Sequence, residues 1–72
     1  MHPSTFEYLK PTPQQMTAMS AVRNAFGDLA HVIACWVPDG PDRDHLERRL
    51  REAGMWANVA ITRHEDGSPR LE

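Results

Sequence analysis

The sequence has little of what usually stabilises a small protein. Its single cysteine, Cys35, excludes an internal disulfide framework, fits a reducing compartment, and is interpreted as a small buried apolar residue. The histidines are scattered and match no zinc-ligand spacing, so no metal site is expected: His2, His31, His45 and His64. In a chain of 72 residues, one hydrophobic core barely offsets the entropy lost on folding. Oligomerisation is the remaining remedy, and we expect it here.

Charge and hydropathy exclude further classes. The formal net charge is -2, so the chain has no global basic field for duplex nucleic acid. No run approaches the ~20 apolar residues of a membrane span, and the first residues do not resemble a signal peptide. We therefore expect a soluble, cytoplasmic protein that binds neither duplex nucleic acid nor a membrane. No phosphate loop, nucleophile elbow or metal-binding pair is present, so neither an enzyme nor a cofactor is predicted.

Capping residues and a heptad stripe predict a first helix. Thr12 can cap its start, Pro13 suits the first helical position, and Gln15 completes a capping box. Apolar residues then follow at steps of three and four: Met19, Val22, Phe26, Leu29, Ile33 and Trp36. The pattern predicts a helix over residues 13–36. Gly27 inside it is interpreted as a point of close packing between helices.

A short turn and a second stripe predict a second helix. Pro38 cannot continue the first helix, and Gly40 and Pro41 provide a cap and a first residue. A second apolar stripe follows at steps of four and three: Leu46, Leu50, Ala53, Ala57 and Ala60. The pattern predicts a helix over residues 41–63, antiparallel to the first. The fold class is all-α, a two-helix antiparallel hairpin.

The two ends of the chain complete a single domain, residues 1–72. Residues 1–11 form an N-terminal arm that is too apolar for a free tail, and we expect it to pack on a helix of its own or of a neighbouring subunit. Residues 64–72 are predicted to be a polar tail. From Met55 onward the second helix is apolar almost all the way round, which is typical of a helix buried on every side. We expect other copies of the chain to bury it.

An aromatic residue and several cations are candidates for ligand binding. Tyr8 and Lys10 lie on the arm, and Arg23 is a charged residue within the first predicted helix, directly after Val22. Rings stack on bases and guanidinium groups bind phosphate oxygens, so this set suits a base-and-phosphate ligand. Spacing alone favours a simpler interpretation, in which Tyr8 anchors the arm and Arg23 is solvated. Arg63 could likewise compensate the helix dipole.

Several segments together resemble one family. The most specific ones are Phe6-Glu7-Tyr8-Leu9-Lys10-Pro11-Thr12 and Glu52-Ala53-Gly54-Met55-Trp56-Ala57-Asn58, with Val37-Pro38-Asp39-Gly40 between them. The resemblance is to the phage anti-CBASS cyclic-nucleotide sponges, whose hairpin domain is shared with anti-Thoeris sponge proteins. It covers residues 6–61.

The resemblance implies a non-enzymatic sponge in the host bacterial cytoplasm. Such proteins bind the cyclic oligonucleotide signals of bacterial immune synthases without cleaving them, so the host effector is never activated. The implied assembly is a hexamer of hairpins, with dimers arranged about a three-fold axis. Cyclic dinucleotides would occupy pockets between paired protomers, and cyclic trinucleotides would occupy separate pockets near the three-fold axis. Binding of cyclic ADP-ribose isomers is left open.

Particular residues match the family's sites. Tyr8 matches the arm tyrosine that stacks on a base of the dinucleotide, with Lys10 beside it. Arg23 matches a basic residue of the first helix that contacts the phosphates, where lysine is expected in relatives. Arg63, together with Asn58, is assigned to the trinucleotide pocket.

Two segments depart from the family. The second helix starts with Gly40-Pro41, where the family often has Gly-Arg. Residues 48–53 read Arg-Arg-Leu-Arg-Glu-Ala, where the family has Thr-Lys-Leu-Glu-Glu-Ala. The ligand range is therefore open. The alternative, which the heptad stripe alone supports equally well, is a small helical oligomeric adaptor or regulator that binds a protein partner.

Overall fold

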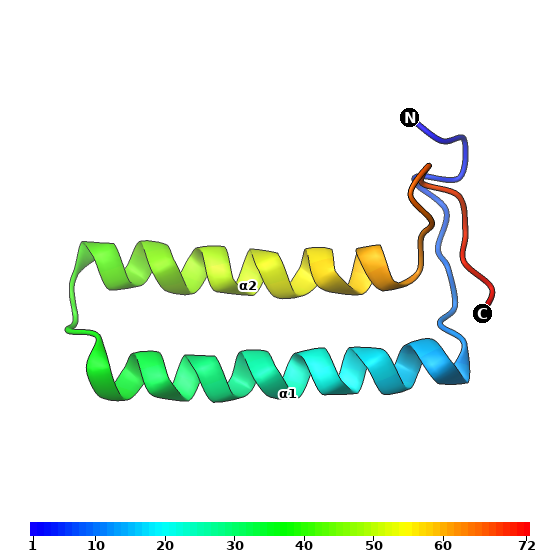
Figure 1. The fold of residues 1–72 in the computed structure, drawn as a ribbon. Coiled ribbons are helices and arrows are strands. Elements are labelled where there is room, and N and C mark those ends of the chain that lie inside the picture. The colour runs from blue at the N-terminus through cyan, green and yellow to red at the C-terminus, as the bar shows by residue number, and fades with distance from the viewer.

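Two antiparallel helices form the body of the protein. The computed structural model describes all 72 residues. It contains α1 (Pro13–Trp36) and α2 (Pro41–Ile61), which pack against each other as a hairpin. The N-terminal arm and the C-terminal tail lie together at the open end of this hairpin (Figure 1). The prediction of an all-α, two-helix hairpin is confirmed.

The helix ends follow the local sequence closely. The Thr12 hydroxyl accepts a hydrogen bond from the Gln15 amide at 3.1 Å, and the Thr12 amide donates to the Gln15 side chain at 3.1 Å. This is the predicted capping box, which satisfies two backbone groups at the start of α1. The second helix ends at Ile61, two residues before the predicted end. The Thr62 hydroxyl donates to the Val59 carbonyl at 2.8 Å, and the next residue leaves the helix to form an isolated bridge with the tail.

The contact between the helices uses a slightly different stripe from the predicted one. On α1, the apolar residues that are at least half-buried are Met19, Val22, Phe26 and Ile33. On α2 they are Leu50, Gly54, Ala57 and Ile61. The prediction had Ala53 and Ala60 in this stripe, and both are exposed. Gly54 and Ile61 directly follow them, and packing Ile61 rather than Ala60 against α1 removes more apolar surface from water.

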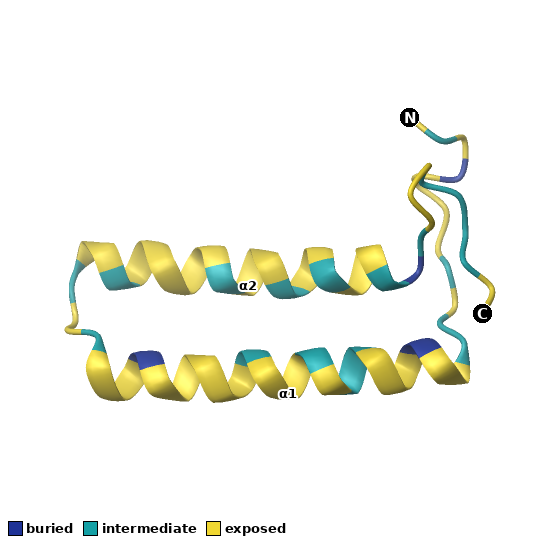
Figure 2. Ribbon diagram, in the orientation of Figure 1, coloured by how far each residue is buried: buried dark blue, intermediate teal, exposed yellow.

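A single chain buries almost no hydrophobic core. Four of the 72 residues are buried, and Ile33, at 5% exposure, is the one hydrophobic residue among them. Most of both helices is exposed in Figure 2. The predictions were wrong for Cys35, which is exposed, and for Gly27, because a Cβ at that position would have no neighbour within 4 Å. The hairpin alone therefore leaves most of its apolar side chains at least partly exposed to water.

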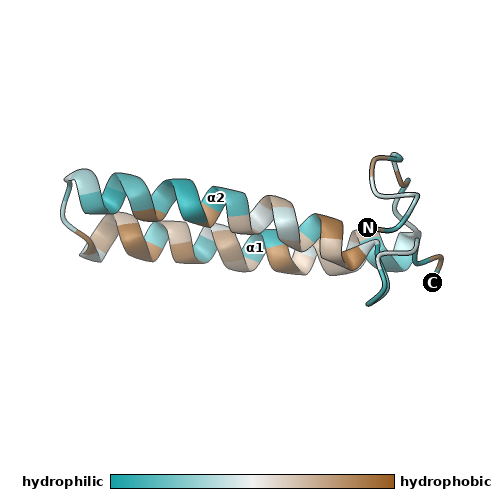
Figure 3. Cartoon of the chain, turned by 90° about the horizontal axis from the view of Figure 1, so that it is seen from above, coloured by the Kyte–Doolittle hydropathy of each residue, from teal (hydrophilic) through white to brown (hydrophobic).

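One face of the hairpin is lined with exposed apolar side chains. Hydrophobic residues run along α1, whereas the first half of α2 is mostly hydrophilic (Figure 3). Exposed apolar residues recur at helical intervals on one side of both helices, and we call this set the apolar face: Ala25, Leu29, Val32, Trp36, Leu46, Ala53 and Ala60. Three of them, Leu29, Trp36 and Leu46, belong to the apolar stripes that predicted the helices, but they lie outside the contact between the helices. Trp36 is 82% exposed.

The tail folds back onto the rest of the chain. The side chain of Gln15, which is only 2% exposed, donates to the main-chain oxygens of Arg70 and Glu72 at 2.7 and 3.1 Å. The Arg70 amide donates to the Thr62 carbonyl at 2.8 Å. The segment predicted to be a polar tail is thus anchored to the start of α1 by a buried amide. Neither helix is long and apolar enough to cross a membrane.

Candidate functional site

Arg63 ties the arm to the end of α2. Its guanidinium donates to the Ser4 hydroxyl at 2.7 Å and to the Gly67 carbonyl at 3.0 Å. It also lies within 3.4 Å of the Thr5 carbonyl and 3.3 Å of the Glu7 carbonyl. One half-buried cation therefore holds backbone from both ends of the chain. This role was not predicted, because backbone carbonyls leave no signature in the sequence.

Replacing Arg63 with alanine is expected to loosen the arm. The hydrogen bonds of this charged group contribute about 1–3 kcal/mol to the free energy of unfolding, and the arm has few other anchors. Hydrogen exchange of the Thr5 and Glu7 amides, which bond to the His2 and Ser4 carbonyls at 3.0 Å, reports the loss directly. Arg70→Ala is the matched control, because the Arg70 guanidinium makes only a long ion pair, 3.8 Å from the Glu72 carboxylate. Equal protection in the two variants would contradict the role given to Arg63.

Asp66 stabilises the turn of the tail through its ionised form. Its carboxylate accepts from the Ser68 hydroxyl at 2.6 Å and from the Ser68 amide at 2.9 Å. These bonds favour the charged form and lower the pKa of Asp66, with smaller contributions from His2 and His64.

The lowered pKa of Asp66 predicts a pH dependence of the tail. A carboxyl whose pKa is depressed by folding contributes stability above its unfolded pKa and loses that contribution as pH falls through the folded pKa. The turn is therefore expected to be unchanged from pH 8 to about pH 5 and to loosen below about pH 4. An NMR titration of the Ser68 amide measures this transition. Asp66→Asn, as the control, removes the ionisable group, and a titration surviving in that variant would assign the transition to another group.

A groove opens beside this anchored arm. We call it the arm groove; its volume is about 340 Å³, and its walls come from the arm, α1 and the end of α2. Tyr8, Asn58 and Arg63 all line it, together with apolar surface from Met19 and Val59. Residues assigned by the resemblance to two separate pockets therefore meet around one groove of a single chain.

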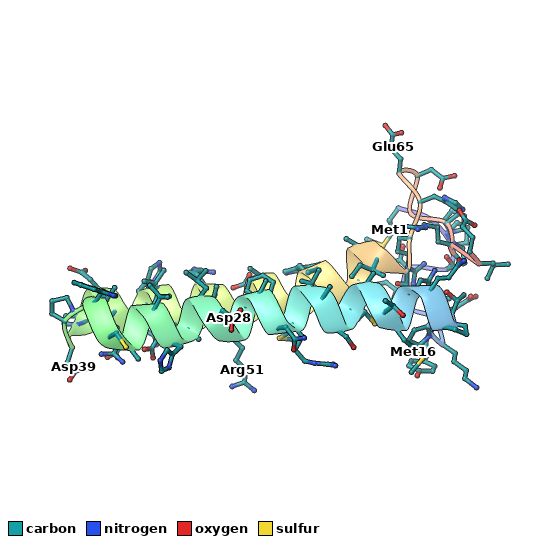
Figure 4. The ribbon with its side chains drawn as sticks, turned by 60° about the horizontal axis from the view of Figure 1, so that its bottom comes forward. Met1, Met16, Asp28, Asp39, Arg51 and Glu65 are labelled. Atoms are coloured by element: carbon teal, nitrogen blue, oxygen red, sulfur yellow. The ribbon has the colours of Figure 1, made fainter.

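A second and larger groove lies farther along the hairpin. We call it the arginine groove; its volume is about 580 Å³, and it lies between the two helices. Arg23 from α1 and Arg51 from α2 both line it, and Phe26 contributes an aromatic wall. Figure 4 shows the Arg51 side chain extending away from the helices near the middle of the hairpin.

A smaller hollow joins the two grooves. Its volume is about 200 Å³, and it shares Asn58 with the arm groove and both Arg23 and Arg51 with the arginine groove. The three hollows thus follow one face of the hairpin, from the arm to its middle. No residue of the apolar face lines any of these three hollows. Helix geometry places the apolar face on the opposite side of the hairpin.

The predicted site residues fall into three groups. Tyr8, Asn58 and Arg63 lie at the arm groove, and the Tyr8 ring is 86% exposed rather than packed on a helix. Arg23 lies at the arginine groove, where it donates to the Ser20 hydroxyl at 3.2 Å. Lys10 is exposed and lines none of these hollows.

Arg51 is the cation of this face that the sequence analysis did not single out. On the sequence it belongs to a run of charged residues typical of a solvated outer face. Only the rotational phase of α2 could have indicated Arg51. When Gly54 faces α1, Arg51 lies at the rim of the same groove.

The chemistry available on this face suits ligands that combine planar rings with anionic groups. An exposed phenol ring, a half-buried phenyl ring and guanidinium groups suit stacked bases and phosphates. No group of three or more His, Cys, Asp or Glu side chains is arranged to hold a metal ion. Comparison of the chain with family models, curated proteins and solved structures finds no match.

Proposed function

We propose that this protein is a homo-oligomeric sponge for cyclic di- and trinucleotide immune signals. It binds these signals in the host bacterial cytoplasm and holds them without cleaving them, so that the defence effector is not activated. The family resemblance of residues 6–61 is the origin of the proposal, and the geometry of the grooves supplies its physical support.

One observation carries most weight: an exposed aromatic ring stands beside a cation at a groove. Tyr8 leaves 86% of its surface unpacked, although burying it would help a chain with so small a core. Asn58 and Arg63 line the same groove. A ring that stacks on a base, with an amide and a guanidinium beside it, is a recognised arrangement for nucleotide binding.

The proposal includes assembly into a homo-oligomer, a hexamer by the family resemblance. It is supported by the single buried hydrophobic residue of the isolated chain and by the exposed apolar face. Burial of that face between copies would supply the missing core, because stability scales with the apolar area removed from water. It would also hold the grooves rigid, which reduces the entropy cost of ligand binding.

Calorimetric titration of the purified protein tests the proposed function. The ligand panel contains cyclic dinucleotides, cyclic trinucleotides and a cyclic ADP-ribose isomer, with the matching linear dinucleotide as the control. We expect at least one cyclic di- or trinucleotide to bind at least tenfold more tightly than its linear counterpart. Absence of binding for every cyclic di- and trinucleotide would overturn the proposal.

The exposed apolar face favours one second candidate, a small helical adaptor or regulator. In that case the face would bury itself against a different protein, with no need for a small ligand. The two candidates differ in the purified protein alone: the adaptor binds no cyclic nucleotide, whereas the sponge binds it without any second protein.

A further inference from the structure

Most of the arginines of this chain already have partners. Arg43 pairs with Asp39 and Glu47, Arg49 pairs with Glu52, and Arg70 lies near Glu72. Arg63 is held by the arm, as described above. The charges of Arg43, Arg49 and Arg70 already face carboxylates, so these three are poor candidates for binding an external anion.

The cations without a carboxylate partner include the two that line the arginine groove. Arg23 bonds only to the neutral Ser20 hydroxyl, and Arg51 makes no ion pair. Glu47 is the one carboxylate on the groove, and its Oε1 accepts from Arg43 at 2.8 Å. Arg48 is also unpaired, but it does not line the arginine groove; it lies at a neighbouring polar depression, which Arg51 shares with it. The arginine groove is therefore lined by two arginines, one from each helix, and neither has an ion-pair partner within the chain.

The groove is also kept open by glycine. Gly27 lies in the middle of α1, where glycine disfavours the helix relative to alanine. A Cβ at Gly27 would have no neighbour within 4 Å, so packing within the chain does not require glycine there. Gly27, Ala30 and Gly54 together give the groove walls of small residues, with Phe26 among them. Such walls admit a flat ring close to the backbone.

We propose that Arg23 and Arg51 together bind the two phosphodiester groups of a cyclic dinucleotide, with one base lying over Gly27 against Phe26. This inference rests on the proposed function and adds Arg51, Gly27 and Phe26 to its site. A cyclic dinucleotide carries two negative charges on one rigid ring, which matches two guanidinium groups on opposite walls of one groove.

Charge-removing variants test the pair. Arg51→Gln and Arg23→Gln are each expected to lower the affinity for cyclic di-AMP or cyclic di-GMP about 10- to 100-fold. Arg49→Gln is the matched control, since it removes the same charge from the same helix but lies outside the groove, and its affinity should stay within about threefold of the parent. The affinity of the parent should fall more steeply with added salt than that of Arg51→Gln.

Gly27→Ala tests the opening independently of charge. Because the added methyl meets nothing in the free protein, it should raise Tm by a few degrees through helix propensity. The same methyl occupies the place proposed for the base, so the affinity should fall about tenfold. Higher stability with unchanged affinity would overturn the inference. A lower Tm together with loss of the oligomer would also overturn it, because a neighbouring subunit would then occupy the space beside Gly27.

The failure of this inference is distinguishable from failure of the proposed function. If the parent and Arg51→Gln bind cyclic dinucleotides equally tightly, the proposed function stands, but Arg51 is not part of the site. A parent that binds cyclic trinucleotides alone also overturns the arginine pair and leaves the sponge standing. A parent that binds no cyclic nucleotide overturns both.

Discussion

The Val32→Glu variant is expected to be monomeric and largely unfolded. Val32 lies on the apolar face and is 51% exposed in the single chain. If copies of the chain bury this face, the introduced carboxylate would lose its water without gaining a partner, which costs several kcal/mol. An isolated hairpin has one buried hydrophobic residue to sustain it, so loss of assembly should lower Tm by roughly 10 °C or more.

Sedimentation and thermal unfolding at several protein concentrations measure this effect. The Tm of the parent should rise with concentration, as for any protein whose fold depends on association. Asn24→Glu is the matched control, because it places the same charge at an exposed position of α1 away from the apolar face. If Val32→Glu keeps the mass and Tm of this control, the apolar face is not an interface between copies.

Replacement of Tyr8 with alanine is expected to lower cyclic dinucleotide affinity about 10- to 100-fold, because stacking on one base contributes about 1–3 kcal/mol. The oligomer and its Tm should be unchanged, since the Tyr8 ring is 86% exposed and no hydrogen bond to its hydroxyl holds it. Tyr8→Phe should keep most of the affinity, because it retains the ring.

Phe6→Ala provides a close control on the same arm. Phe6 is 91% exposed, like Tyr8, but it does not line the arm groove. Its removal should leave dinucleotide affinity within about threefold of the parent. Equal losses for both rings would mean that the arm acts by general hydrophobic contact, and Tyr8 would lose its assigned role.

The helices of this fold were predictable because their determinants are local. The capping box at Thr12 and Gln15 lies within four residues, and α1 begins and ends where it was expected. Gly40, at φ +154°, starts α2 before Pro41, which also agrees with the prediction. Each of these features depends on neighbours along the chain, and one sequence contains all of them.

The burial of the stripes was harder to predict because it depends on helix phase. On α2, apolar residues occur in adjacent pairs, Ala53 with Gly54 and Ala60 with Ile61, so two phases fit the same heptad. On α1, two neighbouring surfaces are apolar: the one that contacts α2 and the apolar face. The sequence alone allows Leu29 and Trp36 to lie on either surface. Pattern alone shows that two apolar surfaces exist but does not divide the residues between them.

The candidate site was predictable only in part. Tyr8 and Arg23 follow from residue type and motif, but the link from Arg63 to Ser4 joins residues 59 apart in sequence and ends on a small hydroxyl. Arg51 depended on the phase of α2, and the opening at Gly27 depended on what lies near it in space. Contacts of this kind come from tertiary structure, which periodicity does not encode.

Ligand release is the most direct measurement of the central claim. The purified protein is incubated with cyclic di- and trinucleotides, freed of unbound ligand by filtration, and heat-denatured, and the supernatant is chromatographed. The sponge predicts that intact cyclic nucleotide appears only after denaturation, in an amount that falls for Tyr8→Ala. Recovery of all the nucleotide in the first filtrate, or of a cleaved product in its place, would contradict sequestration without cleavage.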